Sequence, residues 1–235
     1  MSTLDTTTSA AEDVSSGFGP AFGDNDYQSR LVRDGYVVLP TPLGACPEML
    51  AQVQHAFDQH LLESPELRNP RPNDPKWKNV LGGFAAMGNP SSFHHPFVRK
   101  MREMCEAVVL DADALPLQGR KLEQCYDRVM RRVPGERTDV ESWHRDEAKH
   151  TLQGDDIFGG WLNCDAQRQH FSCAPGTHTE EGARSRNDGF SKITSHAEKA
   201  RYSAIAEIGG GPVVIPPGHI LLFYERLVHE VLKTT

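Results

Sequence analysis

The chain has 235 residues, 38% of them hydrophobic, which is enough for one large domain around a single core. Its formal net charge of −7 argues against a protein that binds the nucleic-acid backbone through a basic face. No apolar run approaches the roughly 18–20 residues that span a bilayer, so we expect neither a nucleic-acid nor a membrane partner.

The first residues and the cysteines indicate the compartment. The N-terminus lacks the basic and apolar regions of a secretory signal. The five cysteines are odd in number and have no Cys-x-x-Cys spacing, which is typical of reduced thiols inside a cell. We therefore predict a cytoplasmic protein, with no functional disulfide between Cys164 and Cys173.

The first half of the chain is expected to be mainly helical. Residues 1–24 are rich in Ser, Thr, Gly and Asp and predict a disordered tail, so that residues 25–235 form a single domain. Apolar spacing and capping residues predict a short helix at 26–33, a strand at 35–40, an amphipathic helix at 47–62 and another helix at 95–110.

The second half has the pattern of a β protein. Short apolar runs alternate with Gly/Pro-rich turns, which favours a sandwich or a barrel. Strands are predicted at 122–133, 141–146, 158–163, 204–208, 213–215 and 220–232. The charged segment at 179–202 is expected to be a long loop that acts as a lid and sets specificity.

A triplet in one of these strands, His144-Arg145-Asp146, combines two side chains that bind metals. Residues i and i+2 of a strand point to the same face, so His144 and Asp146 can converge on one ion while Arg145 points away. His229 would complete the set from a distant strand folded back beside the first. Two histidines and one carboxylate are typical of the facial triad of non-haem Fe(II), which leaves about three positions open.

The triplet alone is weak support for a metal site. With 11 histidines and 32 acidic residues, a solvated loop histidine beside a surface aspartate can arise by chance. The motifs around it carry more weight. In chain order they are GYVVLP (35–40), WHRDEA (143–148), GGWLNCD (159–165), FSCAPGTH (171–178) and IPPGHILLFYERLVHEVL (215–232).

In this order the motifs resemble the phytanoyl-CoA dioxygenase-like family of Fe(II)/2-oxoglutarate-dependent oxygenases, over roughly residues 27–232. The resemblance implies a mainly β fold: a double-stranded β-helix (jelly-roll, cupin-like) core with flanking N-terminal α-helices. It also implies Fe(II) on His144, Asp146 and His229, with 2-oxoglutarate and O₂ as co-substrates and ascorbate as a supporting reductant. The reaction would be hydroxylation of an unidentified small molecule; the sequence sets no oligomeric state.

The same resemblance suggests roles for other residues. Asp146 favours hydroxylation, because related halogenases carry a small residue there to admit chloride. Tyr126 and Trp161 would contact 2-oxoglutarate, although packing roles are about as common for such residues. Asn163 could donate a hydrogen bond near the metal or be structural, and His178 is expected to shape the entrance without binding metal.

The family also anchors the distal carboxylate of 2-oxoglutarate with an arginine roughly ten residues beyond the last histidine, through a bidentate pair. This sequence ends at Thr235, six residues after His229. We therefore expect a chain that lacks its C-terminal strand and binds 2-oxoglutarate weakly, unless Lys233 or Arg226 provides the cation.

Two other classes of protein stay open at this point. One is a metal-binding cupin-type protein that does not use 2-oxoglutarate, and the other is a non-catalytic jelly-roll binding module. Succinate release separates the oxygenase from both, and metal content separates the two alternatives from each other.

Overall fold

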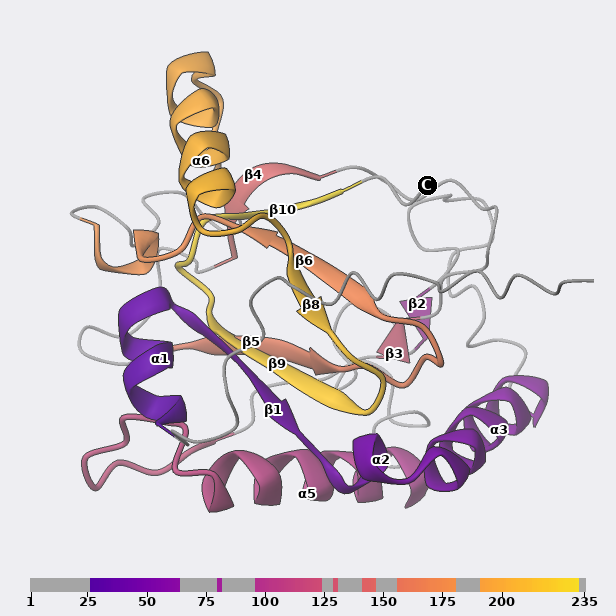
Figure 1. Ribbon diagram of the computed structural model, residues 1–235. Coiled ribbons are helices and arrows are strands. Elements are labelled where there is room, and N and C mark those ends of the chain that lie inside the picture. Colours follow the sequence, from indigo (N-terminus) through magenta and orange to yellow (C-terminus); the bar gives the residue numbers. More distant parts are fainter. Residues whose placement is uncertain are drawn as a thin grey trace, which may run out of the picture.

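Two antiparallel sheets form the centre of the molecule in the computed structural model, which describes residues 26–63, 80–81, 96–123, 129–130, 141–146, 156–180 and 191–232 (Figure 1). The first sheet has three strands in the order β1 (Tyr36–Pro40), β9 (His219–Tyr224), β5 (Phe158–Leu162). The second has five, in the order β7 (Ser191–Lys192), β4 (Glu141–Arg145), β10 (His229–Val231), β6 (Gln169–Cys173), β8 (Val213–Ile215). A separate pair joins β2 (Val80–Leu81) to β3 (Val129–Met130).

The continuous apolar run of β9 is explained by burial on both of its faces. Leu221 and Phe223 point toward the second sheet, where they join a core that includes Phe171 of β6. Ile220 and Leu222 point the other way, into a second core beneath the helices. Because side chains alternate along a strand, an apolar residue is needed at every one of these positions.

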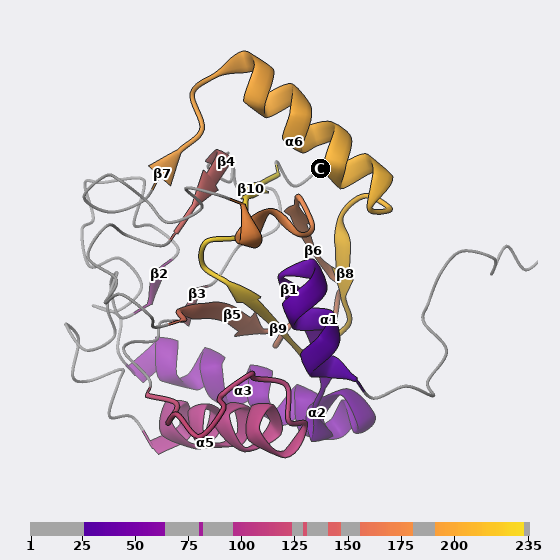
Figure 2. The ribbon, with the colours of Figure 1, turned by 90° about the vertical axis from the view of Figure 1, so that its left-hand side faces the viewer.

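Helices cover the outer faces of both sheets. Four helices precede the strands of the second sheet in the chain: α1 (Tyr27–Asp34), α2 (Pro42–Ala45), α3 (Pro47–Glu63) and α5 (Pro96–Asp111). Residues of α1 and α5 complete the core on the outer face of β1 and β9. The helix α6 (His196–Ile208) covers the opposite side, where Tyr202 and Ala206 pack against Trp143 of β4. Figure 2 shows α6 and the pair α3 and α5 on opposite sides of the strands.

Capping residues explain where two of the helices begin and end. The side chain of Asp26 accepts a hydrogen bond from the backbone N–H of Ser29, and Ser195 does the same for Glu198 at the start of α6. The first helix ends at Gly35, whose φ of 87° lies in the left-handed region that glycine adopts readily. The chain can therefore turn directly from α1 into β1.

Most of the predicted elements are confirmed within one or two residues. The helices at 26–33, 47–62 and 95–110 correspond to α1, α3 and α5, and the strands at 35–40, 141–146, 158–163 and 213–215 correspond to β1, β4, β5 and β8. Of the strand predicted at 122–133, the described residues show β3 alone in strand conformation.

Three predictions are wrong. The strand at 204–208 is the last part of α6, since Tyr202 and Ala206 lie four residues apart and face the sheet together. The strand at 220–232 is two strands, β9 and β10, separated by a turn. The loop at 179–202 contains β7 and the first half of α6, and its residues 181–190 lie outside the described part. Strand β6 was not predicted.

The fold class is mixed, with antiparallel sheets. The expected mainly β composition is not found, because helix exceeds strand among the described residues, and the described strands do not close into a barrel. No described helix has both the length and the apolar character that crossing a membrane requires.

A glycine pair in β5 permits close pairing with β9. A Cβ atom at Gly160 would lie 2.1 Å from the backbone oxygen of Leu221, which cannot move without breaking the sheet. We expect Gly160→Ala to lower the free energy of unfolding by about 3 kcal/mol, the upper end of what overpacking costs. Gly159→Ala is the control, because its Cβ would meet side-chain atoms of Phe223 at 3.0 Å and no backbone atom that close. Urea denaturation measures both, and equal losses would contradict this explanation.

Candidate metal site

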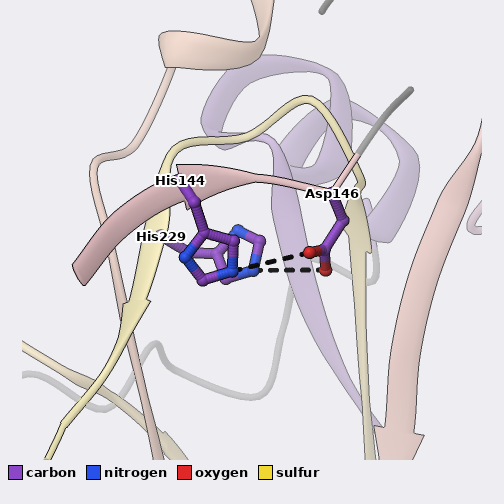
Figure 3. A group of neighbouring side chains, drawn as sticks. All are labelled: His144, Asp146 and His229. Carbon is purple, nitrogen blue, oxygen red and sulfur yellow. Dashed lines mark ion pairs between the residues drawn. The ribbon is translucent and has the colours of Figure 1, made fainter. Parts of the chain in front are cut away.

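His144, Asp146 and His229 come together at one end of the strands, as Figure 3 shows. Their candidate ligand atoms all lie within 4.8 Å of one another. The Nε2 atom of His144 is 3.5 Å from one carboxylate oxygen of Asp146, and the Nε2 atom of His229 is 3.3 Å from the other. Among the residues that the structure describes, no other group of histidine, cysteine and acidic side chains has this proximity.

Strand pairing explains why residues so far apart in sequence meet. β4 and β10 are antiparallel neighbours, and His144 is paired directly with His229. The two side chains therefore lie on the same face of the sheet, with ring centroids 4.2 Å apart. Asp146, two residues after His144, returns to this face, while Arg145 points to the other. The predicted convergence is thus found in the geometry.

Each histidine ring is oriented by a backbone carbonyl two residues earlier. The Nδ1 atom of His144 lies 2.8 Å from the oxygen of Ser142, and that of His229 lies 2.9 Å from the oxygen of Leu227. A carbonyl oxygen can only accept, so both Nδ1 atoms carry the hydrogen. The Nε2 atoms are left to face the carboxylate. Such outer hydrogen bonds fix the tautomer and ring orientation of metal-binding histidines.

The carboxylate of Asp146 supplies the negative charge of the group. Burial alone would raise its pKa, but hydrogen bonds and charges from His144 and His229 outweigh this and hold the pKa well below its usual value. Because each Nδ1 proton is used by a carbonyl, an Nε2 atom can donate to Asp146 only when its ring is positively charged. A metal cation at the centre would take the place of these protons.

The group is buried on the histidine side and more open on the aspartate side. The side chains of His144 and His229 are 2% and 6% exposed, whereas that of Asp146 is 38% exposed. The rings of Phe171 and Phe223 lie against His229, with centroids 5.3 and 5.1 Å away. Access from solvent is therefore past Asp146, and the inner wall is aromatic.

Trp161 lies behind this aromatic wall. Its ring contacts Phe171 and Phe223, with centroids 5.6 and 6.5 Å away, and its indole N–H donates to Gln169 at 2.7 Å. It therefore shares two neighbours with His229, and a packing role accounts for all of these contacts. The other two residues predicted to contact 2-oxoglutarate, Tyr126 and Lys233, lie outside the described residues.

Asn163 and His178 both have structural roles. The amide nitrogen of Asn163 donates to the carbonyls of Gln167 and Ile215, and its oxygen accepts from the backbone of Asp165, so this buried side chain is used in holding turns together. The ring of His178 stacks on Tyr224 at 4.8 Å, and its Nε2 atom donates to Val32 at 2.9 Å. His178 is not one of the three residues of the group.

Arg226, one of the two cations considered for 2-oxoglutarate, pairs with another part of the protein. Its guanidinium lies 2.7 Å from the carboxylate of Asp156 and donates to the carbonyl of His178 at 3.0 Å. Asp156 also pairs with Arg120 at 3.1 Å. Arg226 therefore secures the turn between β9 and β10.

The Asp156 pair gives a pH-dependent prediction. Burial opposes ionisation of Asp156, but hydrogen bonds and charges from Arg226 and Arg120 outweigh it and lower its pKa. A lowered folded-state pKa stabilises the protein above the unfolded value of about 4, and the effect is lost as the pH falls through the folded value. We expect Asp156→Asn to lower the free energy of unfolding by about 1 kcal/mol at pH 7.

In urea denaturation, the difference between Asp156→Asn and the parent protein should shrink toward zero as the pH falls below about 4. Asp34→Asn is the control, because its partner Arg33 is 70% exposed and such pairs contribute little. A difference that stayed constant with pH would show that the charge of Asp156 is not what stabilises the turn.

Some residues of the site could not be found from sequence. The carbonyls of Ser142 and Leu227 orient the histidines, but every residue carries a carbonyl, so no sequence signal marks them. The neighbours of Arg145, which are Glu180 and Tyr202, lie in the segment predicted to be a loop.

Comparisons of the chain with protein-family models, with curated proteins and with solved structures find no match.

Proposed function

We propose that the chain is an Fe(II)- and 2-oxoglutarate-dependent dioxygenase that hydroxylates a small molecule. The observation that carries the proposal is the convergence of His144, Asp146 and His229 from paired strands onto one point. Two imidazole nitrogens and one carboxylate oxygen are the donor set of non-haem Fe(II) oxygenases, and they leave positions for further ligands.

The residues present fit this metal. Both Nδ1 atoms are held by carbonyls, so the Nε2 lone pairs are available on the side where the carboxylate lies. The negative charge of Asp146 offsets part of the charge of a divalent ion. A zinc site of the structural kind would close the coordination with a fourth protein ligand, and the described residues place no fourth histidine, cysteine or acidic group there.

Bound Fe(II) would supply the positions for 2-oxoglutarate and O₂ and the oxidising chemistry. The overall reaction converts 2-oxoglutarate and O₂ to succinate and CO₂, with one oxygen atom entering succinate and the other a C–H bond of the substrate. The protein's own part is to hold the metal, through His144, Asp146 and His229. The aromatic wall of Phe171 and Phe223 keeps water from the side of His229.

We also propose that the two sheets form a double-stranded β-helix. The support is their antiparallel pairing, the shared core of Phe171 and Phe223 between them, and the position of the three candidate ligands on the inner face at one end. Helices α1, α5 and α6 lie outside this pair of sheets.

Formation of succinate tests the proposed activity. The protein is incubated with Fe(II), ascorbate, 2-oxoglutarate and O₂, and succinate is measured with and without candidate substrates. Turnover above that of the His229→Ala variant supports the proposal. Metal binding with no succinate under any condition would point to a cupin-type protein that does not use 2-oxoglutarate, and absence of metal binding would point to a non-catalytic module.

A further inference from the structure

The residue between the two candidate ligands of β4 makes contacts of its own. Arg145 points away from His144 and Asp146 and is buried, with its side chain 10% exposed. Its Nε–H group donates to the carbonyl oxygen of Arg226 at 2.9 Å. A terminal N–H of the guanidinium donates to the carboxylate of Glu180 at 3.1 Å.

The first of these contacts reaches the turn that leads to the third candidate ligand. Arg226 lies between β9 and β10, three residues before His229. The backbone N–H of Asp146 donates to the same turn, at the carbonyl of Glu225, with a distance of 2.9 Å. In the pairing of β4 with β10, His229 lies opposite His144 and Val231 lies opposite Glu141, with a shift of register between these two pairs. Past the His144–His229 pair, the hydrogen bonds from Arg145 and Asp146 join the end of β4 to the turn before β10.

The second contact ties the same guanidinium to the outer layer. The hydroxyl of Tyr202, in α6, donates to Glu180 at 3.2 Å, and Arg201 pairs with the other oxygen of that carboxylate. The guanidinium of Arg145 also lies 5.8 Å from the ring centre of Tyr202. Arg145 thus contacts Tyr202 of α6 and Glu180, which directly follows the 3₁₀ turn η4 (Thr177–Thr179), and on its other side it donates to the turn before β10.

Packing alone does not explain an arginine at this place. A buried ion pair usually adds little net stability compared with apolar side chains of similar size. An apolar residue at position 145 would therefore hold α6 against the sheet equally well. An arginine adds direction, because its planar guanidinium donates along fixed axes from a rigid group. Here one axis ends on Glu180 and another on the turn before His229.

We propose that Arg145 is a positioning residue, whose guanidinium sets the separation between the His144–Asp146 pair and His229 and so the size of the metal site. This inference rests on the proposed function, since it assumes that the three residues bind a metal. Residues that orient metal ligands without touching the ion typically change metal affinity by about 10–100-fold when replaced.

The test uses Co(II) as a probe in the full chain, because its visible absorption reports both affinity and coordination. Arg145→Met keeps most of the side-chain length and loses both hydrogen bonds. We expect it to bind Co(II) about 10–100-fold more weakly than the parent protein, with an altered visible spectrum. Arg145→Lys keeps the charge without the planar fork, and it should fall between the two.

Arg201→Met is the matched control. Arg201 pairs with the same Glu180 and lies over the same Tyr202 ring, but its side chain is 54% exposed and no hydrogen bond joins it to the turn in the described structure. Its Co(II) affinity should stay within about threefold of the parent value, as expected for an exposed pair. Glu180→Gln removes the counter-charge of Arg145 and leaves its contact with the turn. It should therefore lower the melting temperature, while its Co(II) affinity stays within about threefold of the parent value.

The outcomes separate this inference from the proposed function. If the parent protein binds no Co(II) or Fe(II), the proposed metal site fails. If the parent binds Co(II) and both Arg145 variants bind it equally well with the same spectrum, the positioning role is overturned. If Arg145→Met does not fold, Arg145→Lys is compared with Glu180→Gln. The positioning role predicts that Arg145→Lys loses more Co(II) affinity than Glu180→Gln while losing no more stability. Any other result of this comparison overturns the positioning role.

Discussion

A His229→Ala variant is expected to lose nearly all stoichiometric iron and to remain folded. The variant lacks one of three protein ligands, and even replacing a residue that merely orients a ligand costs about 10–100-fold in affinity. The fold should survive, because the missing ring leaves a small cavity beside Phe171 and Phe223, with a cost of about 1–3 kcal/mol. Iron is measured after anaerobic loading and desalting, and folding is followed by circular dichroism.

His144→Ala should behave in the same way, since both rings have an Nε2 atom 3.3–3.5 Å from Asp146 and an Nδ1 atom held by a carbonyl. His170→Ala is the control, because His170 lies on the neighbouring strand β6 but is exposed. It should bind as much iron as the parent protein. Full iron content in a folded His229→Ala variant would remove His229 from the site.

Replacing Asp146 with glycine is expected to abolish hydroxylation while both histidines stay in place. The carboxylate supplies the negative charge of the donor set, and its pKa is held well below the usual value, so it is ionised at neutral pH. We expect turnover of 2-oxoglutarate to fall by at least about 100-fold, more than replacement of an outer partner costs. Succinate formation is the measurement.

Asp146→Asn provides the matched comparison. The amide keeps the size of the side chain and one oxygen that can act as a ligand, but it loses the charge. Its turnover should lie between those of the parent protein and Asp146→Gly. The glycine variant also leaves a coordination position that a halide can fill, so chloride should strengthen its Co(II) binding and have no such effect on the parent. Parent-level succinate formation by Asp146→Gly would show that Asp146 is not a ligand.

Much of the site could be predicted because strand geometry is simple. The spacing of His144 and Asp146 places both on one face of any strand, and the apolar run that ends at His229 indicates a second buried strand. That the two strands are direct neighbours cannot be derived from spacing alone. It depends on pairings of β4, β10 and β6 that join residues far apart in the chain.

The errors in the fold have physical reasons. Residues 204–208 are a short, mostly apolar run before a Gly-rich turn, but the cap at Ser195 and the contact of Tyr202 and Ala206 with the sheet make the segment helical. Strand β6 begins with the polar residues Gln169 and His170, so its apolar pattern is short. The turn inside 220–232 contains Arg226, whose ion pair with Asp156 has no local sequence signal.

Anaerobic titration of 2-oxoglutarate into the Fe(II)-loaded protein tests the central claim most directly. Chelation of Fe(II) by the keto oxygen and carboxylate of 2-oxoglutarate produces a visible metal-to-ligand charge-transfer band. We expect this band to appear in the parent protein and to saturate as 2-oxoglutarate is added, and to be absent in His229→Ala. A parent protein that retains one Fe(II) per chain but develops no band would contradict the assignment of a 2-oxoglutarate-dependent dioxygenase.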